Sequence, residues 1–206
     1  MKELSLHIMD VMQNSITAES TKIAVSVKTC DNDRLLTITV EDNGYGMDEE
    51  TLKRATDPFH TSRTTRLVGR GLPMFKAAAL LTGGDFILES EQGRGTVLTA
   101  VFVNESIDRQ PMGNLGNVFF LTMLSHQDLE LSLVLSSSRG TFYFDSRKFA
   151  VAQERCGNSY MDAAFSAETF INEQAELIFR DILPEMGGGL HGIEGSCKTD
   201  KRQAAL

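Results

Sequence analysis

The chain has 206 residues, of which 41% are hydrophobic and 23% are charged, which is enough for one sizeable core and a small second unit. A formal net charge of −8 argues against sequence-independent binding to nucleic acid, because the phosphates would repel such a surface. No apolar run approaches the roughly 20 residues that span a bilayer, and no basic segment followed by an apolar core opens the chain. Three cysteines without a Cys-x-x-Cys pair favour neither a disulfide framework nor a zinc site. We therefore expect a cytoplasmic protein that binds neither nucleic acid nor membrane.

The first predicted element is a helix from Leu4 to Ala18, whose apolar residues are spaced for packing against a core. Asp10 and Asn14 are about one turn apart on this helix, so their side chains share one face. Mg²⁺ takes oxygen ligands and keeps several waters, so the Asn14 amide oxygen together with phosphate oxygens would suffice to hold it. Asp10 is then placed to orient a water molecule. His7, on the same helix, is predicted to be a packing or supporting residue and not a phosphoacceptor.

Two strands, 22–28 and 34–41, follow this helix, and the second runs into Asp42-Asn43-Gly44-Tyr45-Gly46-Met47. A carboxylate at Asp42 can accept a hydrogen bond from an exocyclic amine. The missing side chains of Gly44 and Gly46 let a flat ring lie against the backbone. This segment, including Met47, is therefore a candidate site for a nitrogen base.

Downstream, Asp48 suits the N-cap of a short helix that ends near Ala55. A lid segment, 56–69, separates it from Gly69-Arg70-Gly71-Leu72-Pro73, which opens a helix over 71–82 with proline near its start. The unpaired amides of that helix start are suited to phosphates. Strands at 85–90 and 96–103 flank the turn Gly93-Arg94-Gly95-Thr96, so Thr96 opens the last strand of this unit.

The remainder is predicted to form a linker, 105–116, and an α+β extension, 117–183, behind a first domain of residues 1–104. Residues 117–124 suit a helix or a strand, 129–135 and 141–145 read as a hairpin, and 161–183 as an amphipathic helix. Two strands and a helix bury little alone, so the extension should dock on the first domain or on a partner. The glycine- and charge-rich tail, 184–206, is predicted to be disordered.

The order of these motifs over residues 4–103 resembles the GHKL superfamily, the ATP-binding fold of gyrases, heat-shock chaperones, histidine kinases and mismatch-repair ATPases. The resemblance implies an α+β fold, a two-layer sandwich of a mixed, mostly antiparallel sheet with helices on one face. It also implies ATP and Mg²⁺ as cofactors, with Asn14 as the metal ligand and Asp10 as the catalytic base. The lid segment is similar to a Pro-Phe-Phe-Thr-Thr-Lys element of histidine kinases. The implied nucleotide-binding residues are Asn14, Asp42, Gly44, Gly46, Met47, Phe59, Arg63, Gly69, Gly71, Leu72 and Thr96.

The chain departs from that family pattern at Asp10, His60 and Pro73, and the changes at His60 and Pro73 remove no phosphate-binding backbone. Histidine kinases commonly carry Asn at the position of Asp10, whereas the hydrolysing branches carry Glu, so Asp10 keeps the charge with a shorter reach. His60 replaces an aromatic residue of the lid. Three activities stay open: slow ATP hydrolysis, an ATP-gated switch that presents the lid or the extension to a protein partner, and phosphoryl transfer to a separate protein. The oligomeric state also stays open.

Overall fold

Alternating apolar and polar residues form the two central strands of one sheet. β1 (Lys22–Cys30) and β2 (Leu35–Asp42) pair antiparallel, with Val25 opposite Val40 and Val27 opposite Ile38. Residues directly opposite each other point to the same side, so these apolar side chains face one layer of helices. All four side chains are buried.

The computed structural model describes residues 3–55, 71–180 and 182–183. The predicted lid, with Phe59, Arg63 and Gly69, and the predicted tail lie outside these residues. In chain order the remaining elements are α1 (Leu4–Thr17), α2 (Glu49–Ala55), α3 (Gly71–Leu81), β3 (Asp85–Glu91), β4 (Gly95–Val103), α4 (Leu115–Ser125), β5 (Glu130–Ser137), β6 (Gly140–Asp145), α5 (Ser146–Arg155) and α6 (Tyr160–Phe179).

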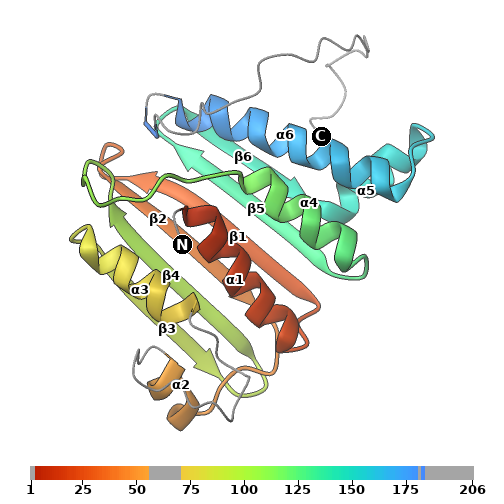
Figure 1. The fold of residues 1–206 in the computed structure, drawn as a ribbon. Helices are drawn as coiled ribbons and strands as arrows, with labels where there is room; N and C mark the ends of the chain where they lie inside the picture. Colours follow the sequence, from red (N-terminus) through yellow and green to blue (C-terminus); the bar gives the residue numbers. More distant parts are fainter. Residues whose placement is uncertain (1–2, 56–70, 181, 184–206) are drawn as a thin grey trace.

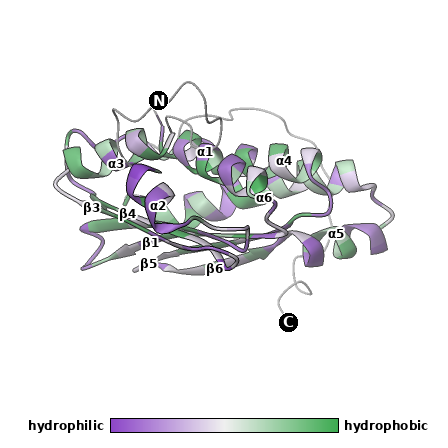
Figure 2. Cartoon of the chain, turned by 90° about the horizontal axis from the view of Figure 1, so that it is seen from below, coloured by the Kyte–Doolittle hydropathy of each residue, from purple (hydrophilic) through white to green (hydrophobic). Residues whose placement is uncertain are grey.

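The six strands form one sheet in the order β3-β4-β2-β1-β5-β6. Every neighbouring pair is antiparallel except β1 and β5, which run parallel. Helices α1, α3, α4 and α6 cover one face of this sheet (Figure 1), and the edge-on view shows the two layers (Figure 2). The predicted α+β sandwich with a mixed, mostly antiparallel sheet is therefore confirmed.

The C-terminal elements add to the same sheet and the same core. β5 pairs with β1 from Lys22 opposite Glu130 to Lys28 opposite Ser136. One cluster of buried apolar residues includes Ile8 of α1 together with Leu133 of β5 and Phe179 of α6. The extension thus docks on the first domain, which is one of the two alternatives predicted for it, while the boundaries at residues 104, 116 and 183 remain predictions.

The segment between β4 and α4 holds the beginning of α1. The Leu4 amide donates to the Pro111 carbonyl at 2.9 Å, and the Ser5 amide donates to the Met112 carbonyl at 2.7 Å. The first amides of a helix lack partners within the helix, so these bonds satisfy two of them. The predicted linker therefore fixes one end of the helix that carries Asp10 and Asn14.

Most predicted elements lie within a few residues of their observed bounds. The segment at 117–124, left open between helix and strand, is helix α4, and α6 ends at Phe179, four residues before the predicted Leu183. Helix α5 was not predicted. Among the helices that the structure describes, none combines the length and the apolar character needed to cross a bilayer.

Candidate functional site

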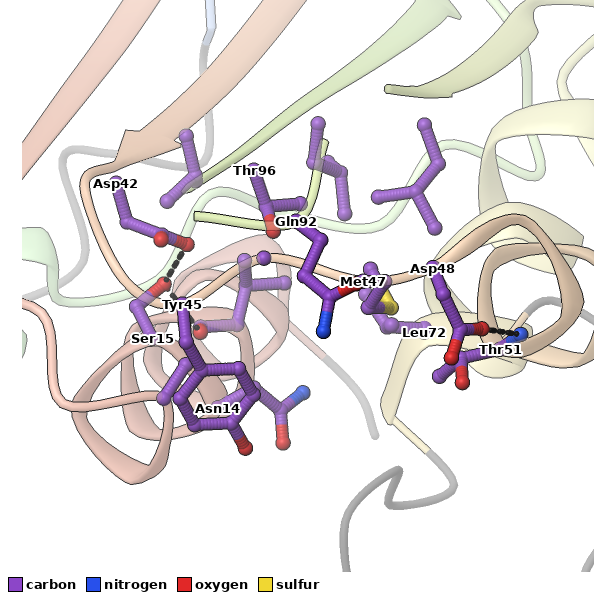
Figure 3. Close-up of a pocket in the computed structure, with 16 residues that line it drawn as sticks. Asn14, Ser15, Asp42, Tyr45, Met47, Asp48, Thr51, Leu72, Gln92 and Thr96 are labelled. Atoms are coloured by element: carbon purple, nitrogen blue, oxygen red, sulfur yellow. Dashed lines mark hydrogen bonds between the residues drawn. The ribbon is translucent and has the colours of Figure 1, made fainter. Parts of the chain in front are cut away.

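A cavity of about 220 Å³ lies between α1, the loop after β2 and the β3–β4 hairpin (Figure 3). A single water needs only about 10–15 Å³ measured in this way, so the space suits a ligand of several rings or groups. Six predicted nucleotide-binding residues line it: Asn14, Asp42, Gly46, Met47, Leu72 and Thr96. The other lining residues are Val11, Ser15, Ala18, Val40, Tyr45, Asp48, Thr51, Leu88, Gln92 and Leu98.

Three hydrogen bonds fix the Asp42 carboxylate at one wall of the cavity. Oδ1 accepts from the Gly44 amide at 2.8 Å and from the Ser20 hydroxyl at 3.1 Å, and Oδ2 accepts from the Ser15 hydroxyl at 2.7 Å. Each carboxylate oxygen has two lone-pair sites. Oδ2 accepts only one of these three bonds and therefore has one lone-pair site left for a ligand. The protein fixes the orientation of the carboxylate before a ligand binds.

The two glycines of the loop lie where the backbone meets other backbone. A β-carbon on Gly44 would come within 2.6 Å of the Ala18 carbonyl oxygen. Gly46 has a φ of +64°, and a β-carbon there would come within 2.1 Å of the Glu91 carbonyl oxygen. Side chains do not fit at either position. Gly44 does not itself line the cavity, so it acts through the bond that its amide gives to Asp42.

Asn14 has a free amide at the cavity. Its side chain is half-buried and makes no hydrogen bond to any residue that the structure describes. Among those residues, His, Cys, Asp and Glu side chains form no group of three or more around a metal-sized space. An ion that takes one amide oxygen together with phosphate oxygens and waters fits this arrangement.

Asp10 lies outside the cavity lining, at the start of α3. The position of a β-carbon on Gly71 is 2.9 Å from Asp10 Oδ2, so the carboxylate is in contact with the first residue of that helix. Gly71 itself does not line the cavity, whereas its neighbour Leu72 does. The structure thus brings together Asp10, Asn14 and the helix start predicted to face phosphates. Phe59, Arg63 and Gly69 fall outside the described residues, so their roles remain predictions.

His7 packs in the core beneath this site, as predicted. It is 1% exposed, its ring stacks on Phe75 of α3 at 4.9 Å between centroids, and Nε2 lies 3.0 Å from Gln110 Oε1. Burial lowers the pKa of His7 below its usual value, and the Gln110 bond opposes that shift. A neutral ring with its proton on Nε2 donates to Gln110, and His7 Nδ1 finds no partner in the described part of the chain.

Ser15, Tyr45 and Gln92 were not predicted as site residues. A signal for Ser15 was available, because it falls on the buried stripe of α1 after Leu4, Ile8 and Val11, where a hydroxyl needs a partner. The local sequence offers no such signal for Gln92, which lies in the β3–β4 turn. Gln92 reaches the cavity because that hairpin packs against the loop after β2.

The family of "Histidine kinase-, DNA gyrase B-, and HSP90-like ATPase" proteins matches residues 2–106 of this chain. Sporulation kinase E of Bacillus subtilis (strain 168) is 34% identical over 97 residues, which cover 46% of this chain and 13% of that protein. Sporulation kinase D of the same organism is 35% identical over 94 residues, 45% of this chain and 18% of that protein. Histidine protein kinase DivJ of Caulobacter vibrioides is 29% identical over 96 residues, 45% of this chain and 16% of that protein.

The chain therefore aligns with less than a fifth of the length of these three relatives. A solved structure, the N-terminal domain of a DNA repair protein, is similar with a TM-score of 0.46 and 14% identity, covering 69% of this chain and 52% of that one. The family match spans just over half of the chain and contains every residue of the cavity. The protein thus belongs to the histidine kinase-, DNA gyrase B- and HSP90-like ATPases, and residues 2–106 form its ATP-binding domain.

Proposed function

We propose that the protein binds Mg-ATP in this cavity and hydrolyses it slowly, with Asp10 as the general base. The observation that carries the proposal is that Asn14 and Asp42 line one cavity while Asp10 lies one turn from Asn14, against the first residue of α3. A base-binding carboxylate, a metal-binding amide and a water-orienting carboxylate then lie in the order that the parts of the nucleotide require.

Recognition of the base falls to Asp42. Oδ2 accepts one hydrogen of the adenine amine, since Ser15 occupies only one of its two lone-pair sites. Bonds from Ser20 and from the Gly44 amide keep the carboxylate from rotating. A fixed acceptor loses little conformational entropy on binding. The apolar side chains of the cavity wall pack against the faces of the ring.

The phosphates extend from the base toward Asn14 and the beginning of α3. Asn14 supplies an amide oxygen to Mg²⁺, and the first amides of α3 face the phosphate oxygens. Bound Mg²⁺ supplies charge neutralisation at the phosphates. The lid residues Phe59 and Arg63 are proposed to close over this end of the site.

Asp10 acts on water at the terminal phosphate. It accepts a proton as the water oxygen bonds to the γ-phosphorus, while the bond from that phosphorus to the bridging oxygen breaks and ADP leaves. The carboxylate is half-buried and makes no hydrogen bond to a described residue, so it is free to accept that proton. Asp has one methylene fewer than Glu, which favours a low turnover rate.

Steady-state phosphate release with calorimetric titration of ADP tests this proposal. Asp10→Asn should abolish release and leave ADP affinity within about twofold, because it removes the base and keeps the shape. Asn14→Ala should mainly remove the magnesium dependence of binding. Gln13→Ala, an exposed neighbour on α1, is the matched control and should change neither quantity. Absence of adenine nucleotide binding at millimolar concentration would refute the proposal.

A second candidate function is phosphoryl transfer to a separate protein. It is supported by the names of the similar proteins, which include two sporulation kinases and a histidine protein kinase. In that case the terminal phosphate of ATP passes to a side chain of a partner that docks near the lid or the C-terminal extension. Incubation with γ-labelled ATP and a cell extract distinguishes the two, because transfer labels a protein whereas hydrolysis releases labelled inorganic phosphate only.

A further inference from the structure

The β3–β4 turn is locked onto the loop that carries Asp42. The Gly93 amide donates to the Tyr45 carbonyl at 2.8 Å, and the Arg94 amide closes the turn on the Glu91 carbonyl at 3.0 Å. Gly93 has a φ of +81°, as expected for the third residue of a type II turn. Gln92, the residue before it, is therefore held at the cavity by backbone contacts on both sides.

The Gln92 side chain extends into the cavity instead of lying along the surface of the turn (Figure 3). Its amide makes no hydrogen bond to any residue in the described part of the chain. Two other polar side chains of the wall are engaged: Asp42 accepts three bonds, and Thr96 Oγ1 lies 2.9 Å from the Ser90 hydroxyl. Among the described residues, the side-chain amides of Asn14 and Gln92 line the cavity, and the proposed function gives a role only to Asn14.

The chemistry of an amide matches what Asp42 leaves unsatisfied on adenine. The adenine amine has two hydrogens, and Asp42 takes one of them. The other hydrogen lies beside a ring nitrogen that accepts, and a glutamine amide can accept from the amine and donate to that nitrogen together. Guanine carries a carbonyl oxygen in place of the amine, so it presents an acceptor to the Asp42 carboxylate and does not fit against it in the orientation that Gln92 would contact.

We propose that Gln92 is a base-specificity residue, whose amide hydrogen-bonds the edge of adenine that Asp42 leaves free. The proposal rests on the function proposed above and adds a residue that is not among the nucleotide-binding residues predicted from the sequence. A bond of this kind typically changes affinity about 3- to 10-fold. Because the Gln92 side chain is exposed and unbonded in the described residues, its removal should leave the fold intact.

The test is calorimetric titration of the full chain with ADP, GDP, 1-deaza-ADP and 7-deaza-ADP. Gln92→Ala should weaken ADP binding about 3- to 10-fold and change GDP affinity less than twofold. The preference of the protein for ADP over GDP should therefore decrease. One of the two deaza analogues lacks the ring nitrogen that Gln92 contacts, and the natural protein should bind that analogue more weakly than ADP. Gln92→Ala should then reduce the affinity for that analogue by less than it reduces the affinity for ADP. Arg94→Ala is the control. Arg94 lies in the same turn, its guanidinium pairs with the Glu91 carboxylate at 2.7 Å, and it does not line the cavity.

Equal ADP affinity of the natural protein and Gln92→Ala would overturn this inference, as would an equal loss with ADP and both deaza analogues. Either result leaves the proposed function standing, because the natural protein still binds ADP. If the natural protein does not bind ADP, the proposed function fails and this inference fails with it. A loss of ADP affinity in Arg94→Ala as large as that in Gln92→Ala would also overturn this inference, since the turn and not the Gln92 amide would then be responsible.

Discussion

Asp10 Oδ2 lies 2.9 Å from the point that a β-carbon on Gly71 would occupy, and the Asp10 β-carbon lies 3.0 Å from the same point. The proposed base on α1 and the first residue of α3 are thus in direct contact. Only a residue without a side chain lets the two helices approach in this way. The position of Asp10 therefore depends on α3 as much as on its own helix.

Gly71→Ala should reduce phosphate release about tenfold or more while ADP affinity falls by less, because the added methyl group displaces the Asp10 carboxylate. Steady-state kinetics at saturating ATP together with ADP titration measure the two effects. Ala77→Ser, at an exposed position of the same helix, is the control and should leave both unchanged. Normal turnover in Gly71→Ala would show that Asp10 is not held by this contact.

Ser15→Ala should weaken ADP binding about fivefold, since the buried hydroxyl donates to Asp42 Oδ2 at 2.7 Å and a net contribution of about 1 kcal/mol is typical. Titration with ADP and with purine riboside diphosphate, which lacks the amine, should show a larger loss for ADP. Thr17→Ala is the matched control, because Thr17 is exposed on the same helix and, among the described residues, its hydroxyl bonds only the Gln13 carbonyl. Equal losses for the two nucleotides would contradict a role in orienting Asp42.

Gly46→Ala and Gly93→Ala form a matched pair for the effect of close backbone approach. Both residues have positive φ, of +64° and +81°, but a β-carbon on Gly46 would meet the Glu91 carbonyl oxygen whereas one on Gly93 meets nothing within 4 Å. We expect Gly93→Ala to lower the free energy of unfolding by about 1 kcal/mol and Gly46→Ala by at least about 3 kcal/mol. Urea unfolding measures both, and equal costs would contradict the predicted collision.

The stability of the protein should fall as pH drops below about 6.5, partly because of His7. Burial is the largest influence on the His7 pKa and lowers it in the folded state, with the Gln110 bond opposing and with smaller opposed effects of the chain N-terminus and Asp10. A lowered folded pKa means that the unfolded chain binds the proton more readily. The loss therefore begins at the unfolded pKa and is complete at the lower folded pKa.

Thermal unfolding between pH 8 and pH 5 measures this effect, with His7→Phe as the comparison. Phenylalanine can still stack on Phe75 and cannot titrate, so its stability should fall less steeply over the same window. The variant loses the Gln110 bond, which should lower its stability at pH 8 by about 1 kcal/mol. Parallel pH curves for the two proteins would show that His7 does not contribute.

The sequence predicted the elements whose residues carry a local signal. Alternation marked β1 and β2, and Asp48 caps the short helix as expected, since its carboxylate accepts from the Thr51 amide at 2.7 Å. Helix α5 was missed because its residues are mostly polar, although Asp145 accepts from the Lys148 amide at 3.0 Å and could have been recognised as an N-cap.

Relations between distant segments were not predictable in the same way. The parallel pairing of β1 with β5 and the reach of Gln92 into the cavity depend on which strands become neighbours, and periodicity carries no information about that. Asp42 could be recognised because its loop has a distinctive sequence motif, Asp42-Asn43-Gly44-Tyr45-Gly46. The position of Ser15 on the buried face of α1 carried a signal, but the bonds from Ser15 and Ser20 to Asp42 became clear only once α1 and the segment after it were placed beside the loop.

The parallel pairing has a practical consequence for anyone who expresses the ATP-binding part alone. A recombinant fragment stopping at residue 106, where the family match ends, would strip β5 from its neighbour and leave seven β1 positions, Lys22 to Lys28, without their partners. An exposed edge strand has unpaired N–H and C=O groups that can pair with strands of other chains. Such a fragment should precipitate or form oligomers unless the C-terminal half is supplied.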